Sequence, residues 1–260
     1  MAAAQGNPKG KGQGNRPNGQ GNRPGSQGKR PGTPVRGYRP PAKKTNWFAI
    51  WVSVASAVVV IAIVAAVVLI NNKSSEPAVA PTASNIDTST GSVSFGTGSN
   101  TVDTYIDFLC PYCQQFEESE GDTIQQLIDD GEITLNVHPV TILDNYSSGT
   151  YYSSRAAGAF FSVAQYDPAS AYAFLTALYE NQPEENSTGL TNEELVQIAE
   201  DAGVNMTDEL ESSILNNEYQ SFAQEMSDSS GISGTPTVLV NGTKISVTYD
   251  AQTDIVDQLN

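Results

Sequence analysis

Cysteine and histidine are scarce in this chain, whose 260 residues include two Cys and one His. Two cysteines cannot form the multiple cross-links of a disulfide-rich scaffold. A structural zinc site needs four ligands, and His138 is the only histidine that could join the two cysteines. We therefore expect no disulfide framework, no metal and no cofactor in this protein.

Acids are absent from the start of the chain, and bases are scarce in the rest. The first 46 residues contain ten Lys or Arg and no acid, whereas the remaining residues contain three bases and all 29 acids. Such unequal parts usually occupy two compartments or meet two kinds of partner. The sequence therefore excludes one uniform globular domain, and the acidity of the second part argues against a nucleic-acid partner.

Residues 47–70 form an apolar run without a charged side chain. A helix of this length rises about 36 Å and can cross a hydrocarbon core of about 30 Å. A cleaved signal and a buried core helix are the alternatives, but the run is longer than a signal's hydrophobic region, which favours a transmembrane anchor. Because the bases precede it, the positive-inside rule predicts a cytoplasmic N-terminus and an extracytoplasmic remainder.

The segments on either side of this run have biased compositions. Residues 1–46 contain ten Gly and seven Pro, which predicts a disordered cytoplasmic arm. Its bases suit contact with anionic headgroups or nucleic acid, but a solvated tail that only fixes the topology is the interpretation we favour. Residues 71–91 are rich in Ser, Thr, Pro and Ala, which predicts a flexible linker.

Residues 92–260 are numerous enough for one domain with its own core. A β-branched and aromatic run over 101–109 predicts a strand covered on both faces, with which residues 93–95 can pair. Pro111 opens a helical pattern that ends at Gly131, and residues 133–137 alternate as the next strand. The order predicts a parallel strand–helix–strand unit with a right-handed crossover.

Residues 151–230 differ from this unit because helical spacing replaces strand alternation. Four helical patterns are present, and Thr191 with Glu194 forms a capping box before the third. The fourth pattern extends from Leu210 to Met226. We therefore predict four helices inserted into an α/β domain.

The last segment returns to strand character. Residues 236–240 and 245–247 are rich in β-branched side chains and flank Asn241-Gly242, a dipeptide typical of a tight hairpin. A short helix over 250–259 is expected to close the chain.

Both cysteines lie in one motif, Cys110-Pro111-Tyr112-Cys113, where the predicted strand meets the predicted helix. The free N–H groups and partial positive charge of a helix N-terminus stabilise a thiolate at the first cysteine. The second cysteine is one turn further along, close enough to attack a mixed disulfide. A structural disulfide here would restrict little chain entropy. The pattern indicates a redox-active disulfide with Cys110 and Cys113 as catalytic residues.

A wider set of residues accompanies this motif, namely the segments 107–113, 115–117 and 234–237 together with Asn241-Gly242. With them, the domain resembles the DsbA-like oxidoreductases of the thioredoxin fold, specifically the membrane-anchored actinobacterial type. The resemblance covers about residues 92–260. It implies an α/β thioredoxin fold with a helical insertion between the third and fourth strands.

The resemblance also implies roles for residues around the cysteines. The family's proline is cis and faces the disulfide, which makes Pro236 cis and Thr235 and Pro236 the expected substrate-binding residues. Pro111 and Tyr112 complete the active-site motif, and Tyr112 occupies the position that tunes the redox poise.

One position departs from the family pattern. Thr104 stands where related proteins commonly bury a carboxylate that handles the proton of the inner thiol. Strand alternation places Asp107 on the opposite face, and the acids near the motif oppose thiolate formation. We therefore expect Cys110 to be less acidic than in the strongest oxidants.

The expected function is extracytoplasmic thiol–disulfide exchange that forms disulfides in exported cysteine-containing proteins. A membrane quinone-linked thiol oxidase is the expected partner that reoxidises Cys110 and Cys113. The same residues suit a reductase or an isomerase, because the reduction potential decides the direction. A non-catalytic domain that binds extended peptides beside Pro236 is the alternative from another class.

Overall fold

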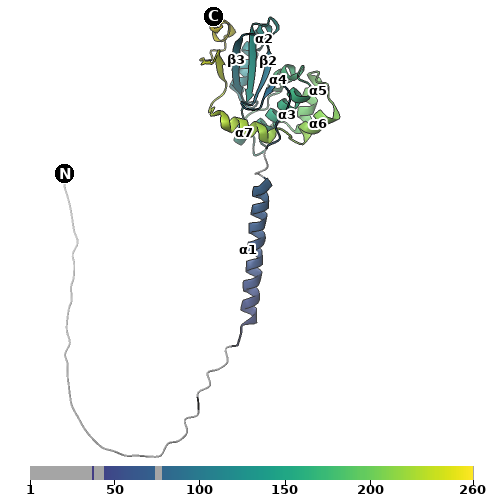
Figure 1. The fold of residues 1–260 in the computed structure, drawn as a ribbon, viewed down its shortest axis with the longest axis vertical. Coiled ribbons are helices and arrows are strands. Elements are labelled where there is room, and N and C mark those ends of the chain that lie inside the picture. The colour runs from purple at the N-terminus through teal and green to yellow at the C-terminus, as the bar shows by residue number, and fades with distance from the viewer. Residues whose placement is uncertain (1–36, 38–43, 74–77, 260) are drawn as a thin grey trace, which may run out of the picture. The chain divides into compact units, whose positions relative to one another are not determined.

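The computed structural model describes residues 37, 44–73 and 78–259 (Figure 1). Most of the predicted arm over 1–46 therefore lies outside the described residues. The predicted helix over 47–70 is present as α1 (Trp47–Lys73). Within the described part of the chain, no helix has both the length and the apolarity that crossing a membrane requires. The anchor therefore stays a prediction.

The folded domain is built on one six-stranded sheet in the order β1-β2-β4-β3-β5-β6. Strands β3 and β4 are parallel, and the other neighbouring strands are antiparallel. The strands are β1 (Ile86–Asp87), β2 (Ser92–Gly96), β3 (Asn100–Ile106), β4 (Ile133–Pro139), β5 (Thr237–Val240) and β6 (Thr243–Lys244).

Two sequence-based expectations about the start of this domain are wrong. Residues 93–95 do not pair with β3, because β2 lies against β4, with Val93 opposite Val137. The predicted linker over 71–91 ends too late, since the buried Ile86 already pairs with Val93. Backbone pairing and burial of one side chain thus bring residues 86–91 into the domain.

The strand–helix–strand unit has the predicted form. Helix α2 (Pro111–Asp129) connects β3 to β4, and Ile106 lies opposite Pro139 at the end of the parallel pair. A glycine inside a helix weakens it, but α2 continues through Gly121 without a break. Because α2 begins shortly after β3 ends, the first turn of the helix lies near the C-terminal end of this interior strand.

The insertion contains five helices rather than four. They are α3 (Tyr152–Tyr166), α4 (Ala171–Glu180), α5 (Asn192–Asp201), α6 (Asp208–Leu215) and α7 (Gln220–Ser230). The pattern from Leu210 to Met226 divides because Asn217 has a left-handed backbone, with φ 55°. The capping box of Thr191 and Glu194 is confirmed at the start of α5.

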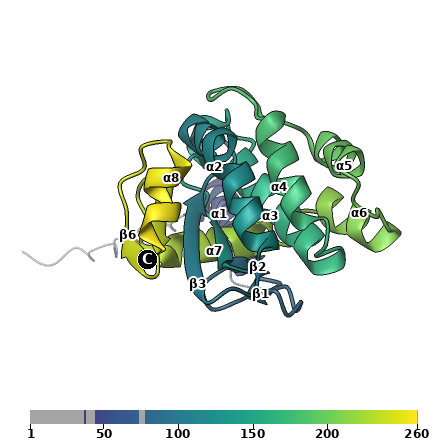
Figure 2. The ribbon, with the colours of Figure 1, turned by 90° about the horizontal axis from the view of Figure 1, so that it is seen from above.

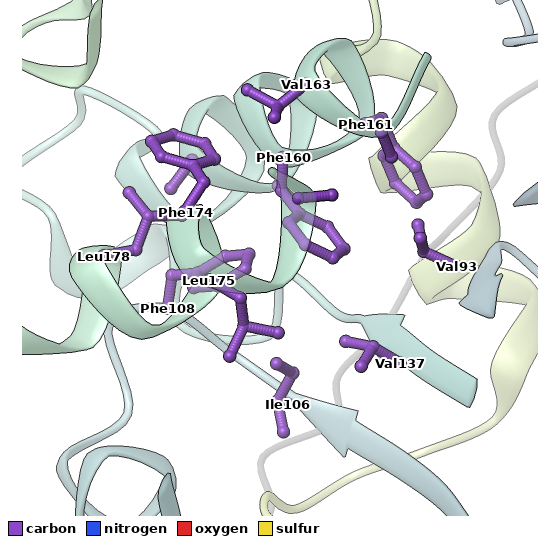
Figure 3. Close-up of a cluster of buried hydrophobic side chains, with 14 of the residues drawn as sticks. Val93, Ile106, Phe108, Val137, Phe160, Phe161, Val163, Phe174, Leu175 and Leu178 are labelled. Atoms are coloured by element: carbon purple, nitrogen blue, oxygen red, sulfur yellow. The ribbon is translucent and has the colours of Figure 1, made fainter. Parts of the chain in front are cut away.

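The core forms where the insertion meets the sheet. Figure 3 shows Phe160 of α3 and Leu175 of α4 facing Ile106 and Val137 of the strands. Phe108, which follows β3, packs against Phe160 with ring centroids 5.7 Å apart. The segment that leads into the cysteine motif is therefore part of the main core.

The C-terminal segment forms the predicted hairpin and a divided helix. Asn241 and Gly242 have φ values of 50° and 75°, which suit a type I′ turn. The second strand is only β6, so residues 245–247 are not a strand. The expected helix over 250–259 is α8 (Ala251–Asp254) followed by a 3₁₀ turn (Val256–Gln258). Helix α8 packs beside α2, as Figure 2 shows.

Candidate active site

The two cysteines occupy the N-terminus of α2. Cys110 is the N-cap residue and Pro111 begins the helix. Proline suits this first position because an N–H there would have no partner within the helix. Cys113 is one turn further along, and its backbone N–H donates to the carbonyl of Cys110. Both residues are free thiols in this structure; Cys110 is 5% exposed and Cys113 is fully buried. Cys110 therefore carries the outer sulfur of the pair, and Cys113 carries the inner sulfur.

The environment acidifies the thiol of Cys110. A hydrogen bond from the Cys113 side chain, helped by the Thr235 side chain and the N–H groups of Cys113 and Tyr112, lowers the pKa of Cys110 to about 6 against the opposing effect of burial. The helix N-terminus thus contributes, but the second thiol contributes most. This value agrees with the expectation that Cys110 is acidic without reaching the range of the strongest oxidants.

The thiol of Cys113 behaves in the opposite way. Burial, followed by the adjacent Cys110, raises the pKa of Cys113 well above its ordinary value. The inner sulfur therefore keeps its proton while the outer sulfur ionises at neutral pH. This division gives Cys110 the character of a nucleophile and a leaving group, and Cys113 that of a hydrogen-bond donor to it.

The segment before β5 lies across from Cys110. The Thr235–Pro236 peptide bond is cis, as the resemblance implied. The Cys110 Sγ lies 3.5 Å from the Thr235 carbonyl oxygen, to which the thiol can donate. Residues 125 positions apart in the chain therefore meet at the sulfur.

The acids near the motif oppose the thiolate less than their number suggests. Burial raises the pKa of Asp107 to about 7 and that of Glu120 to about 8, and burial also raises the pKa of Glu117. These carboxyls therefore hold protons at higher pH than exposed acids do. Counting acids along the sequence overstated the negative charge because the sequence does not show which of them are buried.

The side chain of Asp107 is engaged with the backbone of the site. It lies just beyond the end of β3, where its carboxylate oxygens accept the N–H groups of Leu109 and Leu143, each at 2.9 Å. Thr104 is buried and lines a cavity of about 10 Å³ with Cys113 and Glu117. Position 104 thus contributes a hydroxyl to this cavity, and Glu117 contributes a carboxyl to it.

The helical insertion holds the backbone of the motif, which the sequence did not indicate. The Tyr179 hydroxyl donates to the carbonyl of Asp107 at 3.3 Å. The Gln182 side-chain amide donates to the carbonyls of Phe108 and Cys110 at 3.0 and 3.1 Å. These donors are more than 70 positions from their acceptors, so no local pattern predicts them.

His138 packs among polar and aromatic side chains of the sheet. Its Nε2 lies 3.2 Å from the Asp103 carboxylate and its ring stacks on Tyr105 with centroids 4.2 Å apart. The hydrogen bond from His138 lowers the pKa of Asp103. This pair does not contact the cysteines through any described hydrogen bond.

Comparison with known proteins agrees with this geometry. A model of the thioredoxin family matches residues 96–258. The chain belongs to this family. Serine/threonine-protein kinase PknE of Mycobacterium tuberculosis is 32% identical over 111 residues, which are 41% of this chain and 20% of the kinase. The matched region is thus about one fifth of that relative's length.

Two solved structures from Mycobacterium tuberculosis resemble this thioredoxin-family chain. The reduced disulfide bond oxidoreductase DsbG is 30% identical, with a TM-score of 0.54, and the match covers 64% of this chain and 79% of that one. Oxidised DsbA is also 30% identical, with a TM-score of 0.53, and the match covers 65% and 84%. The predicted DsbA-like resemblance is confirmed.

Proposed function

We propose that this protein is an extracytoplasmic, membrane-anchored thiol–disulfide oxidoreductase that forms disulfides in exported proteins. The observation that carries the proposal is the unequal pair of thiols: an acidified Cys110 at a helix N-terminus facing cis-Pro236, and a buried Cys113 behind it. The likeness to DsbG and DsbA supports the reaction class. The apolar run over 47–70 and the bases before it support the anchor and its orientation.

The reaction begins with the disulfide form of Cys110 and Cys113. A substrate thiolate attacks the Sγ of Cys110, the Cys110–Cys113 bond breaks, and Cys113 leaves as a thiolate that takes up a proton. A second substrate thiolate then attacks the substrate sulfur of the mixed disulfide and releases the Cys110 thiolate. The substrate loses two electrons and gains a disulfide, while the enzyme becomes the dithiol; a membrane quinone-linked thiol oxidase would restore its disulfide.

The low pKa of Cys110 favours the oxidising direction. A stabilised thiolate lowers the free energy of the reduced enzyme and so makes its disulfide a stronger oxidant. We expect glutathione equilibration to give a reduction potential well above the value of about −270 mV typical of thioredoxin. A potential near that of thioredoxin would assign a reductase instead.

Trapping tests the catalytic role of the pair. In Cys113→Ala, the Cys110 thiolate can attack a disulfide of an exported protein and release one of its sulfurs as a thiolate, which leaves a mixed disulfide at Cys110. No inner thiol remains to attack this bond, so covalent complexes through Cys110 are expected to accumulate in cells and to disappear on treatment with dithiothreitol. The double variant Cys110→Ser/Cys113→Ala is the matched control and should capture nothing. Equal capture by both variants, or none by either, would favour a passive binding domain.

A further inference from the structure

A pair of buried carboxyl groups joins the active-site helix to the C-terminal helix. Glu120 of α2 is fully buried, and neither of its carboxyl oxygens receives a hydrogen bond from a described donor. The carboxyl of Asp254 in α8, itself 2% exposed, lies within hydrogen-bonding reach of it. Two neighbouring buried carboxyls disfavour double ionisation, so we expect this pair to hold one proton.

The hydrogen bonds around the pair decide which residue holds the proton. Asp254 accepts the N–H of Thr248 at 2.6 Å, the Thr248 hydroxyl at 2.8 Å and the N–H of Tyr249 at 3.0 Å. Burial raises the pKa of Asp254, but these bonds and the bond from Glu120 outweigh it and lower the pKa. Asp254 is therefore the carboxylate, and Glu120 is the acid that donates to it.

The bonds to Asp254 hold the backbone of Tyr249 in an unusual conformation. Tyr249 has φ 64°, in the left-handed region that a bulky side chain rarely adopts. Both N–H groups of the bend, those of Thr248 and Tyr249, are fixed on the same Asp254 oxygen. Strained residues of this kind persist only where the surroundings hold them, and they concentrate at functional sites.

The side chain of Tyr249 lies in the electrostatic field of the two thiols. Burial, then the charges of Cys110, Cys113 and Tyr112, raises the pKa of Tyr249. Tyr249 is partly exposed, and Tyr112, between the cysteines, is 61% exposed. Strand β6 runs antiparallel to β5, and the Ile245 N–H donates to the Val238 carbonyl. The chain beyond β6 therefore returns toward Thr235, whose carbonyl lies 3.5 Å from the Cys110 Sγ. The bend at Tyr249 thus lies at the same end of the sheet as the thiols, where accessible aromatic side chains commonly supply binding energy to extended peptides.

We propose that Tyr249 is a substrate-contacting residue of the thiol site, and that Glu120 and Asp254 are positioning residues that hold it there. This inference rests on the proposed function. Glu120 belongs to the same helix as Cys113, so the contact ties Tyr249 to the element that carries the sulfurs. The substrate would be the unfolded polypeptide around a cysteine, which offers apolar surface and backbone groups to a tyrosine.

Kinetics of the full chain, oxidised and in detergent, test the role of Tyr249. With reduced unfolded ribonuclease as substrate, Tyr249→Ala is expected to raise KM about ten-fold, with kcat changed less than about two-fold. Its reaction with dithiothreitol, too small to need the contact, should equal that of the wild type. Tyr166→Ala, which removes a tyrosine that is 41% exposed at the end of α3, should leave KM unchanged.

The outcomes separate the two proposals. An unchanged KM in Tyr249→Ala, with normal activity of the wild type, would overturn the role of Tyr249 alone. A wild-type protein that reacts neither with dithiothreitol nor with ribonuclease would overturn the proposed function itself.

The pH profile tests the positioning role of Glu120. Asp254 and Asp250, with Tyr249, are the titratable groups that face it, and burial followed by Asp254 and Asp250 raises the pKa of Glu120 to about 8. Above that pH the two carboxylates repel, so the wild-type KM is expected to rise between pH 7 and pH 9. Glu120→Gln cannot ionise and its amide still donates to Asp254, so its KM should not rise.

The substrate thiols titrate equally in assays of both proteins, so the ratio of the two KM values reports on Glu120. A ratio that stays constant from pH 7 to pH 9 would overturn the positioning role, even if Glu120→Gln lowers the melting temperature.

Discussion

The strand–helix–strand unit of residues 100–139 and the helical insertion of residues 152–230 serve the thiol site in different ways. The first supplies the sulfur atoms and the helix N-terminus that polarises one of them. The second supplies Tyr179 and Gln182, which donate to the carbonyls of Asp107, Phe108 and Cys110. Reactivity thus belongs to a short local unit, whereas the rigidity of its backbone comes from distant helices.

The largest effect we expect is the loss of stability when a buried phenylalanine side chain is removed from either region. Phe174 of the insertion and Phe116 of α2 are both buried, at 0% and 3% exposure. Phe174→Ala and Phe116→Ala should each reduce the free energy of unfolding by about 3–5 kcal/mol, measured in urea.

Titration of the thiol in the two variants tests whether both regions affect the reactivity of Cys110. Phe116 lines the small cavity beside Cys113, so its loss should shift the pKa of Cys110, measured by thiolate absorbance. Phe174→Ala should leave that pKa unchanged. A similar shift in both variants would show that the insertion also controls reactivity, and the division between the regions would fail.

The next effect is a pH dependence of stability caused by Asp107. Its pKa is raised by burial from 3.8 to about 7 in the folded protein, so the folded state binds the proton more tightly. The stabilisation of the folded state by this proton is complete below about pH 4 and is lost as pH rises to about 7. The free energy of unfolding falls by about 4 kcal/mol at most.

Urea titrations of the oxidised protein at several pH values measure this contribution without interference from the thiols. In Asp107→Asn the free energy of unfolding should fall less between pH 4 and pH 7 than in the wild type. Glu120 contributes equally to both curves, so their difference isolates Asp107. Identical slopes would mean that Asp107 ionises normally in the folded chain.

The smallest effect concerns the amide of Gln182. Gln182→Ala removes both donors to the carbonyls of Phe108 and Cys110, which should cost about 1 kcal/mol of stability and speed hydrogen exchange at Leu109. Asn181→Ala is the matched control, because its amide donates to Ala177 in the neighbouring turn of α4 and not to the motif. Equal exchange in both variants would break the claim that the insertion holds the active-site backbone.

Local physical rules were enough to predict the reactive unit. Pro111 at the helix start, the apolar positions of α2 and the β-branched runs on either side were correctly interpreted, because each depends on residues within a turn or a strand. The pairing of β2 was wrong, since strand neighbours depend on the whole sheet. The prediction of one helix from Leu210 to Met226 was wrong, because the left-handed residue Asn217 divides an otherwise continuous helical spacing.

The sequence by itself determined where the two thiols lie: at the junction of a strand and a helix, with one sulfur a turn behind the other. Only the tertiary structure decided which charges act on them. Burial depends on segments that meet across more than 100 positions, as Cys110 and Thr235 do. The removal of water from Asp107, Glu120 and Cys113 is what sets their proton affinities, and no local pattern of residues encodes that removal.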